Sequence, residues 1–126
     1  MKTTKTVRKG GFTLVEIMIV VAIIGLLAAI AIPNFVRARA TSQANACINN
    51  LRQIDAAINE WALEQGKKTG DGPASLTTDL TPYIKLNAGG AIPGCPAKGT
   101  YTVAVVGATP QVSCSLSTLN PPHALP

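Results

Sequence analysis

An apolar run near the N-terminus constrains this chain more than any other feature. From Phe12 to Ile32, over 21 residues, the only polar side chains are those of Thr13 and Glu16. A helix of about 20 apolar residues is long enough to cross a lipid bilayer. The run therefore predicts a membrane-spanning helix, and it leaves one carboxylate, that of Glu16, to be explained.

The positive charge of the chain is concentrated before this run. Four basic residues among the first nine supply most of the formal net charge of +5, and the rest of the chain is nearly neutral. A basic flank stays on the cytoplasmic side of a membrane, so the part after the span is expected outside the cytoplasm. The basic isoelectric point thus reports the N-terminus and not a nucleic-acid-binding face, and no nucleic acid is predicted as a partner of the isolated chain.

Three interpretations of this N-terminal pattern compete. A cleaved signal peptide has a shorter apolar core of roughly 7–15 residues, so the length of the run argues against it. A plain signal anchor fits the topology but leaves Glu16 unexplained. The third interpretation accounts for Gly11, Phe12 and Glu16 together. The segment KGGFTLVEIMIVVAIIGLLAAIAIP, which ends at Pro33, resembles the N-terminus of type IV prepilins and of the pseudopilins of type II secretion.

The resemblance implies a defined processing and assembly route. A prepilin peptidase would cleave between Gly11 and Phe12, the new amine of Phe12 would be methylated, and Glu16 would act in subunit assembly. The implied partners are other copies of the chain in a helical filament, the peptidase, an inner-membrane assembly platform and the lipid bilayer. The implied location is the cytoplasmic membrane, in a single pass with a cytoplasmic N-terminus, and then an extracytoplasmic filament.

Glu16 also has a purely local explanation. Thr13-x-x-Glu16 is a capping-box pattern, in which the carboxylate accepts from a backbone amide of the first helical turn. This interpretation requires a helix that begins near Phe12, an end that cleavage would create. The local and intermolecular roles are compatible. We favour an intermolecular role, because acidic groups within membrane spans are rare and usually functional.

The helical pattern continues beyond the apolar run. After Pro33 there is no glycine or proline until Gly66. Gly25 and Pro33 are expected to bend the helix without ending it. A buried stripe is predicted from apolar residues at spacings of four, three, four and three, namely Cys47, Leu51, Ile54, Ile58 and Trp61.

These patterns, together with the resemblance to pilins, predict four parts and an α+β, pilin-like fold. Residues 1–11 form a basic leader, residues 12–36 a transmembrane and filament-core helix, and residues 37–65 its amphipathic continuation. Residues 66–126 form a small extracytoplasmic β domain that packs on the helix and ends in a Pro-rich tail, expected to be poorly ordered.

Within the expected β domain, two alternating segments predict a hairpin. Residues 101–105 should direct Tyr101, Val103 and Val105 to one face, and residues 112–116 should alternate in the same way. Gly107 to Pro110 would form the turn between them. Before the hairpin, a short helix or turn should direct Leu80, Tyr83 and Ile84 inward. Because a lone hairpin is marginal in water, it should pack on the helical stripe.

No arrangement of residues in the sequence indicates an enzyme. The single histidine, His123, lies in the Pro-rich tail, where a solvated side chain is expected. The sequence has no Cys-x-x-Cys pair of the kind found in zinc and redox sites. Asp71 and Asp79 do not have the spacing of an EF-hand. No catalytic residue, metal ion or cofactor is therefore predicted.

Three cysteines would face an oxidising compartment with this topology. Cys47 and Cys114 lie at positions where each could be a small core hydrophobe, whereas Cys95 lies in the turn-rich segment IPGCPAKG. We rank a Cys95–Cys114 disulfide first and a Cys47–Cys95 disulfide second. The resemblance to pilins with a C-terminal disulfide loop favours the first. Either pairing leaves one thiol over, unless that thiol pairs between chains.

The function implied by the resemblance is that of a structural filament subunit, in a type IV pilus or a type II secretion pseudopilus. The small domain and the short segment that follows EWALEQG are similar to those of the main secretion pseudopilin, which slightly favours a pseudopilin. The cysteines and the lack of an obvious calcium loop depart from that subunit. The alternative from another class is a monomeric, membrane-anchored extracytoplasmic binding module.

Overall fold

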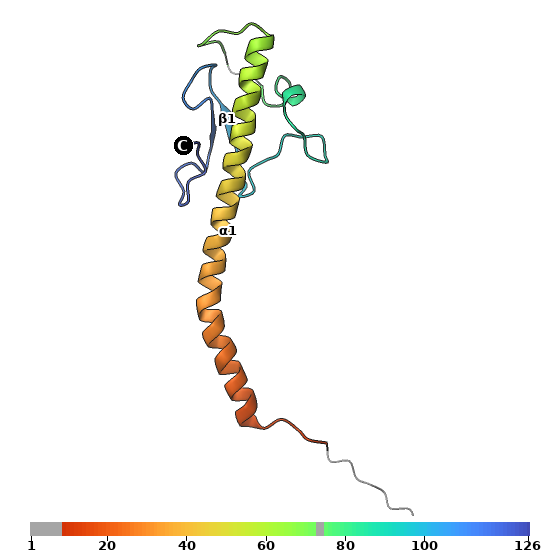
Figure 1. Ribbon diagram of the computed structural model, residues 1–126, viewed down its shortest axis with the longest axis vertical. Helices are drawn as coiled ribbons and strands as arrows, with labels where there is room; N and C mark the ends of the chain where they lie inside the picture. Colours follow the sequence, from red (N-terminus) through yellow and green to blue (C-terminus); the bar gives the residue numbers. More distant parts are fainter. Residues whose placement is uncertain (1–8, 73–74) are drawn as a thin grey trace, which may run out of the picture. The chain divides into compact units, whose positions relative to one another are not determined.

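The structure is a computed structural model that describes residues 9–72 and 75–126. Its elements are the helix α1 (Leu14–Glu64), the 3-10 helix η1 (Thr81–Tyr83) and the strands β1 (Tyr101–Val103) and β2 (Val112–Cys114). Figure 1 shows the long helix α1 and the position of β1, which pairs with β2 in a small antiparallel sheet. This is the predicted α+β fold. The first eight residues of the expected leader lie outside the described residues.

The helix α1 matches the predicted range closely, since it begins two residues later and ends one residue earlier than expected. Its C-terminus is set by Gly66, which has a φ of 62° and so adopts the left-handed conformation that glycine tolerates best. The amide of Gly66 donates to the carbonyl of Leu63 over 3.4 Å, and that of Lys67 donates to the carbonyl of Ala62 over 2.8 Å. This pair of bonds satisfies carbonyls that would otherwise have no partner at the end of the helix.

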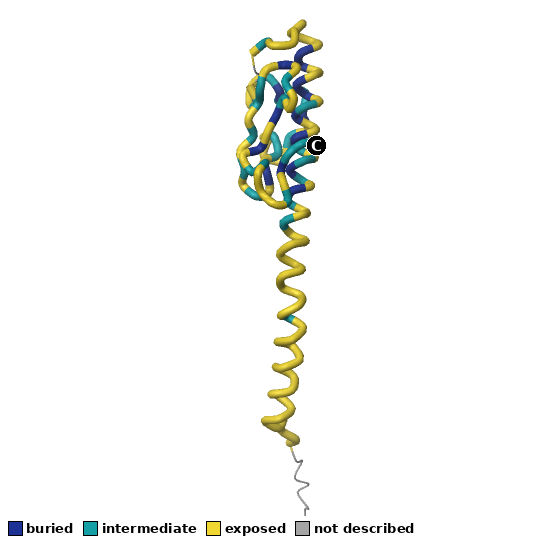
Figure 2. Tube along the Cα trace, turned by 90° about the vertical axis from the view of Figure 1, so that its left-hand side faces the viewer, coloured by how far each residue is buried: buried dark blue, intermediate teal, exposed yellow. Residues whose placement is uncertain are grey.

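The chain divides into two compact units between Arg37 and Ala38, and we describe each by itself. In the first unit the described residues are almost all exposed, and Figure 2 shows this part of the helix mostly in yellow. The most apolar 18-residue window of α1 has a mean hydropathy of 2.9, and none of it is buried. The helix is long and apolar enough to cross a membrane. The predicted bends at Gly25 and Pro33 stay predictions, although Pro33 does lie inside the helix.

The second unit is built around the predicted stripe of α1, and all five of its residues are buried. Three alanines of α1, Ala44, Ala57 and Ala62, are buried as well. Leu80 and Ile84 flank η1 and complete the core, as the sequence predicted. At the end of α1, the hydroxyl of Tyr83 donates a hydrogen bond to the carboxylate of Glu64.

The strands β1 and β2 form the predicted antiparallel hairpin, with Tyr101 opposite Cys114 and Val103 opposite Val112. The expectation for Val105 is wrong, because its side chain is 40% exposed whereas that of Val106 is buried. Strand β1 ends at Val103, so its alternation does not extend to residue 105. The backbone of Val106 instead exchanges hydrogen bonds with the loop after α1, to the carbonyl of Asp71 and from the amide of Gly70.

The C-terminal segment differs from the expected poorly ordered tail. His123 is only 4% exposed, so the expectation of a solvated histidine is wrong. Its amide donates to the carbonyl of Leu116 over 3.4 Å, and Leu125 packs against the core. Tertiary contacts therefore hold this segment in place despite its three prolines, and they bury its histidine within the second unit.

Candidate functional site

The first candidate site is the start of α1, where the capping box is formed. The amide of Thr13 donates to Oε2 of Glu16 over 2.8 Å, and the amide of Glu16 donates to Oγ1 of Thr13 over 3.3 Å. Two amides of the first turn thereby gain partners. We expected this helix end only after cleavage, but it is present in the uncleaved chain. The local role of Glu16 is therefore observed, and its intermolecular role stays a prediction.

The predicted cleavage point lies just outside this helix end. Gly11 and Phe12 precede the first residue of α1 and are exposed, with Phe12 at 87%. A Cβ added at Gly10 or at Gly11 would meet no atom within 4 Å. The chain itself thus does not require glycine at either position. Any requirement for glycine at residue 11 would have to come from an enzyme that binds this segment.

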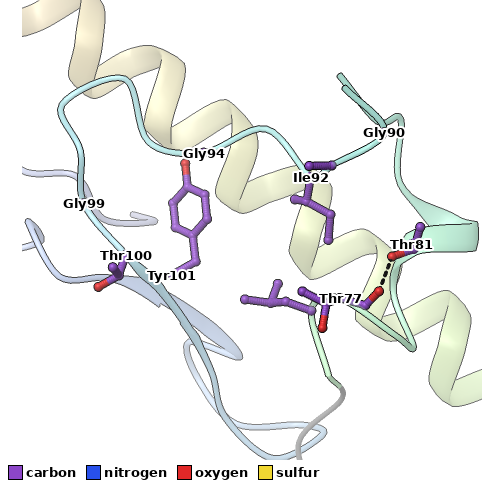
Figure 3. A pocket seen from close by; sticks show the side chains of 10 residues that line it. Thr77, Thr81, Gly90, Ile92, Gly94, Gly99, Thr100 and Tyr101 are labelled. Carbon is purple, nitrogen blue, oxygen red and sulfur yellow. Dashed lines mark hydrogen bonds between the residues drawn. The ribbon is translucent and has the colours of Figure 1, made fainter. Parts of the chain in front are cut away.

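The second candidate site is a pocket of about 450 Å³ in the second unit. Figure 3 shows Tyr101 on one wall and Ile92, Thr77 and Thr81 on the other, where the Thr81 hydroxyl donates to the carbonyl of Thr77. Among the described residues that line it there is no acid, histidine, lysine, arginine or cysteine. The lining offers apolar surface and hydroxyl groups, but no pair of groups for acid–base or nucleophilic chemistry.

The third candidate site is a buried cluster of three cysteines and the histidine. Cys47 comes from α1, Cys95 from the loop before β1, Cys114 from β2 and His123 from the C-terminal segment. One ligand atom from each residue lies within 4.8 Å of those from the other three. Nδ1 of His123 is 3.4 Å from Sγ of Cys95. All three cysteines are free thiols, and the predicted disulfide pairings remain predictions.

The surroundings of these thiols change their acidity in opposite directions. Burial raises the pKa of the Cys47 thiol to about 12. Burial also acts to raise the pKa of Cys95, but hydrogen bonds from the backbone at Gly99 and Ala97 and from the other two thiols bring it below its ordinary value. Backbone donors of this kind favour a thiolate.

Sequence analysis did not detect this cluster, because its four residues lie in four separate segments with no recognisable spacing. The one available signal was the expected burial of Cys47 and Cys114, which is confirmed. Asp71 and Asp79, considered for calcium, instead accept hydrogen bonds from nearby backbone amides, those of Lys68 and Ser75. Their carboxylates serve local turns.

Comparison with known proteins finds similarity in the N-terminal part of the chain. A family model of the prokaryotic N-terminal methylation motif matches residues 7–32. The chain is 48% identical over 60 residues to the type IV major pilin protein PilA of Myxococcus xanthus. The aligned residues cover 48% of this chain and 27% of the relative. It is also 48% identical over 67 residues to the type IV major fimbrial protein FimA of Dichelobacter nodosus. The aligned residues cover 53% of this chain and 42% of that relative.

A further relative is the type IV major pilin protein PilE1 of Neisseria gonorrhoeae, 39% identical over 80 residues that cover 60% of the chain and 48% of the relative. The chain thus spans less than half the length of each of these relatives. These relatives are structural pilin subunits and not enzymes, in agreement with the absence of catalytic residues from the sequence prediction. No solved structure matches the chain. The N-terminal part of this chain carries the prokaryotic N-terminal methylation motif and is similar to the type IV major pilin and fimbrial proteins named above.

Proposed function

We propose that the protein is a structural subunit of a type IV pilus-like filament, assembled through α1 after removal of the leader. The observation that carries this proposal is the exposed apolar surface of α1 in the first unit. The carboxylate of Glu16 lies near the N-terminal end of this surface. Sixteen residues of the first unit are large, apolar and exposed, and Ala28 lies half-buried among them. They are Phe12, Leu14, Val15, Ile17, Met18, Ile19, Val20, Val21, Ile23, Ile24, Leu26, Leu27, Ile30, Ile32, Phe35 and Val36.

An apolar surface of this extent is unstable in water and needs a covering. Lipid covers it while the subunit is anchored in the membrane, and copies of the same helix replace the lipid in the filament. Small residues favour such packing because they let two helix backbones approach closely. Gly25 fits this role, since a Cβ added there would meet no atom of its own chain.

Glu16 is the polar element of this proposed interface. After cleavage the Phe12 amine is charged and lies one helical turn before the carboxylate. In a filament both charges enter a drier environment, where an unpaired charge is costly and an opposite partner is strongly favoured. Pairing of Glu16 with the Phe12 amine of a neighbouring subunit would penalise wrong axial registers. The capping box does not compete with this pairing, because a carboxylate has several acceptor positions.

A secretion pseudopilin is the second candidate, favoured by the small second unit and by the short turn η1 that follows the end of α1. The two candidates share processing and helix packing, and they differ in what the filament does. The relatives described above are named as pilins and fimbrial proteins, so we place the pilus first. The prepilin peptidase and an inner-membrane assembly platform are partners in either case.

The test is deletion of the protein from its own host, with two readouts in the same strain. We expect loss of sheared surface filaments and unchanged release of exported proteins. Loss of protein export with normal surface filaments would instead identify the pseudopilin. A deletion that leaves both unchanged, together with an intact Gly11–Phe12 bond in the purified protein, would favour the monomeric binding module.

A further inference from the structure

We propose that Cys47, Cys95, Cys114 and His123 form a tetrahedral zinc site that fastens the second unit together. This site is independent of the proposed filament function. Its three sulfurs and one ring nitrogen are the ligand set of a structural Cys3His zinc site, in which four protein ligands close the coordination shell. Thiolate and imidazole ligands in a tetrahedral arrangement select zinc over the hard cations magnesium and calcium.

The distances within the cluster suit this geometry. Zinc–sulfur bonds of about 2.3 Å and zinc–nitrogen bonds of about 2.0 Å place tetrahedral ligand atoms roughly 3.5–3.8 Å apart. The distance of 3.4 Å between Sγ of Cys95 and Nδ1 of His123 is already close to such an edge. The remaining separations do not exceed 4.8 Å, so small side-chain rotations would bring all four atoms onto one ion.

The cluster uses every cysteine and the only histidine of the chain, and all four side chains are buried. A disulfide would use two cysteines and leave a third buried thiol and a buried imidazole without a role. Zinc binding gives a role to all four groups. The ion displaces three thiol protons to solvent and forms three Zn–S bonds and one Zn–N bond, and no electron is transferred.

Two of the sulfurs have hydrogen-bond partners outside the cluster. The backbone at Ala97 and Gly99 donates to the sulfur of Cys95, and the Tyr101 hydroxyl bonds to the sulfur of Cys47. Tyr101 is in turn positioned by Nδ2 of Asn50, which donates to its hydroxyl over 3.2 Å. Such outer hydrogen bonds orient metal ligands and offset the charge of bound thiolates.

The backbone beside the cluster leaves no room for a larger residue. A Cβ at Gly99 would lie 2.5 Å from Sγ of Cys114, so only glycine lets the loop pass this sulfur. Lys98, just before it, has a φ of 65°, which brings the chain round in a tight turn after Cys95. A close backbone approach to a ligand sulfur explains this local shape.

The test uses the full chain, extracted in detergent and purified without reductant or chelator. Metal content is measured by elemental mass spectrometry, and thiols are counted by alkylation in denaturant with EDTA. We expect about one zinc ion per chain, three alkylated cysteines, and, after exchange into Co2+, the intense visible absorption of tetrahedral cobalt with sulfur charge-transfer bands. A protein with one alkylated cysteine and an intact mass about two daltons lower contains a disulfide and overturns the proposal.

Variants separate ligation from folding. His123→Ala should lose the stoichiometric zinc, whereas His123→Cys should retain it and change the cobalt spectrum, because a fourth thiolate replaces the imidazole. Tyr101→Phe should weaken zinc binding by about tenfold or more, as removal of an outer partner usually does. Val112→Ala is the matched control, since Val112 is buried in β2 two residues from Cys114 but offers no ligand atom.

Three free thiols with no zinc, even after titration with Zn2+, would overturn the site. So would a stoichiometric content of iron or copper in place of zinc. Equal zinc content in wild type and His123→Ala would remove the histidine from the proposed ligand set and refute the Cys3His assignment.

Discussion

The backbone amide of Thr13 donates a hydrogen bond of 2.8 Å to the Glu16 carboxylate in the chain that still carries its leader. Capping of α1 therefore does not depend on cleavage. If capping were the whole role of Glu16, glutamine would serve almost as well, because both residues occur at this position of a capping box. A substitution of Glu16 by glutamine can therefore distinguish the local capping role from the intermolecular role.

We predict that Glu16→Gln is cleaved and held in the membrane but assembles poorly. Loss of one charge leaves the Phe12 amine of a neighbour unpaired in a dry interface, so sheared filament should fall by about tenfold or more. The measurement compares sheared filament with the membrane pool of cleaved subunit. Thr13→Val is the control, since it removes the hydroxyl acceptor of the Glu16 amide and leaves the carboxylate in place. Equal filament yields from both variants and wild type would leave capping as a sufficient explanation.

Leader removal should depend on Gly11 and not on Gly10. Both glycines are exposed, and a side chain at either would meet no atom within 4 Å, so the chain should tolerate valine equally at both. We predict that Gly11→Val leaves the full-length precursor in the membrane, because a branched side chain next to the scissile bond obstructs the peptidase. Gly10→Val should be cleaved. Intact mass of the membrane-extracted proteins distinguishes the two forms, and normal trimming of Gly11→Val would refute the proposed cleavage point.

Trp61 should be among the most sensitive positions of the second unit. Its side chain is 9% exposed and packs in the core, with the Lys67 ammonium 5.7 Å from the ring centroid. Trp61→Ala should lower the free energy of unfolding by roughly 3–5 kcal/mol. Chemical denaturation of residues 38–126 measures this. Leu63→Ala, on the same helix but 85% exposed, should change the free energy by less than about 0.5 kcal/mol. Similar midpoints for the two variants would contradict the assigned burial.

The end of α1 provides a backbone test. Gly66 has a φ of 62°, and an alanine there would carry a strained Cβ, so Gly66→Ala should destabilise the second unit by about 1–2 kcal/mol. At Gly72 the φ is not positive and the space is open, so Gly72→Ala should be neutral or slightly stabilising. Thermal unfolding of both variants under the same conditions gives the comparison. A Gly66→Ala variant as stable as wild type would mean that the helix ends by another route.

The sequence by itself determined the features that depend on neighbouring residues. The apolar run from Phe12 to Ile32, in which only Thr13 and Glu16 are polar, identified the exposed, membrane-length part of α1, and periodic spacing identified its buried stripe. Glycine at residue 66 marked the end of the helix, since the left-handed conformation is a local requirement. Alternation over residues 101–105 and 112–116 identified where both strands begin, although each strand ends two residues earlier than predicted.

Only the tertiary structure decided which distant segments meet. Val106, and not Val105, became buried because its backbone pairs with the loop at residues 70 and 71, a contact that strand periodicity does not encode. His123 was expected in solvent because its neighbours are prolines, yet long-range packing places its ring nitrogen 3.4 Å from the Cys95 sulfur. The same packing assembles four buried ligand atoms from four segments. Their proximity is a property of the folded core, so it could not be predicted from local spacing in the sequence.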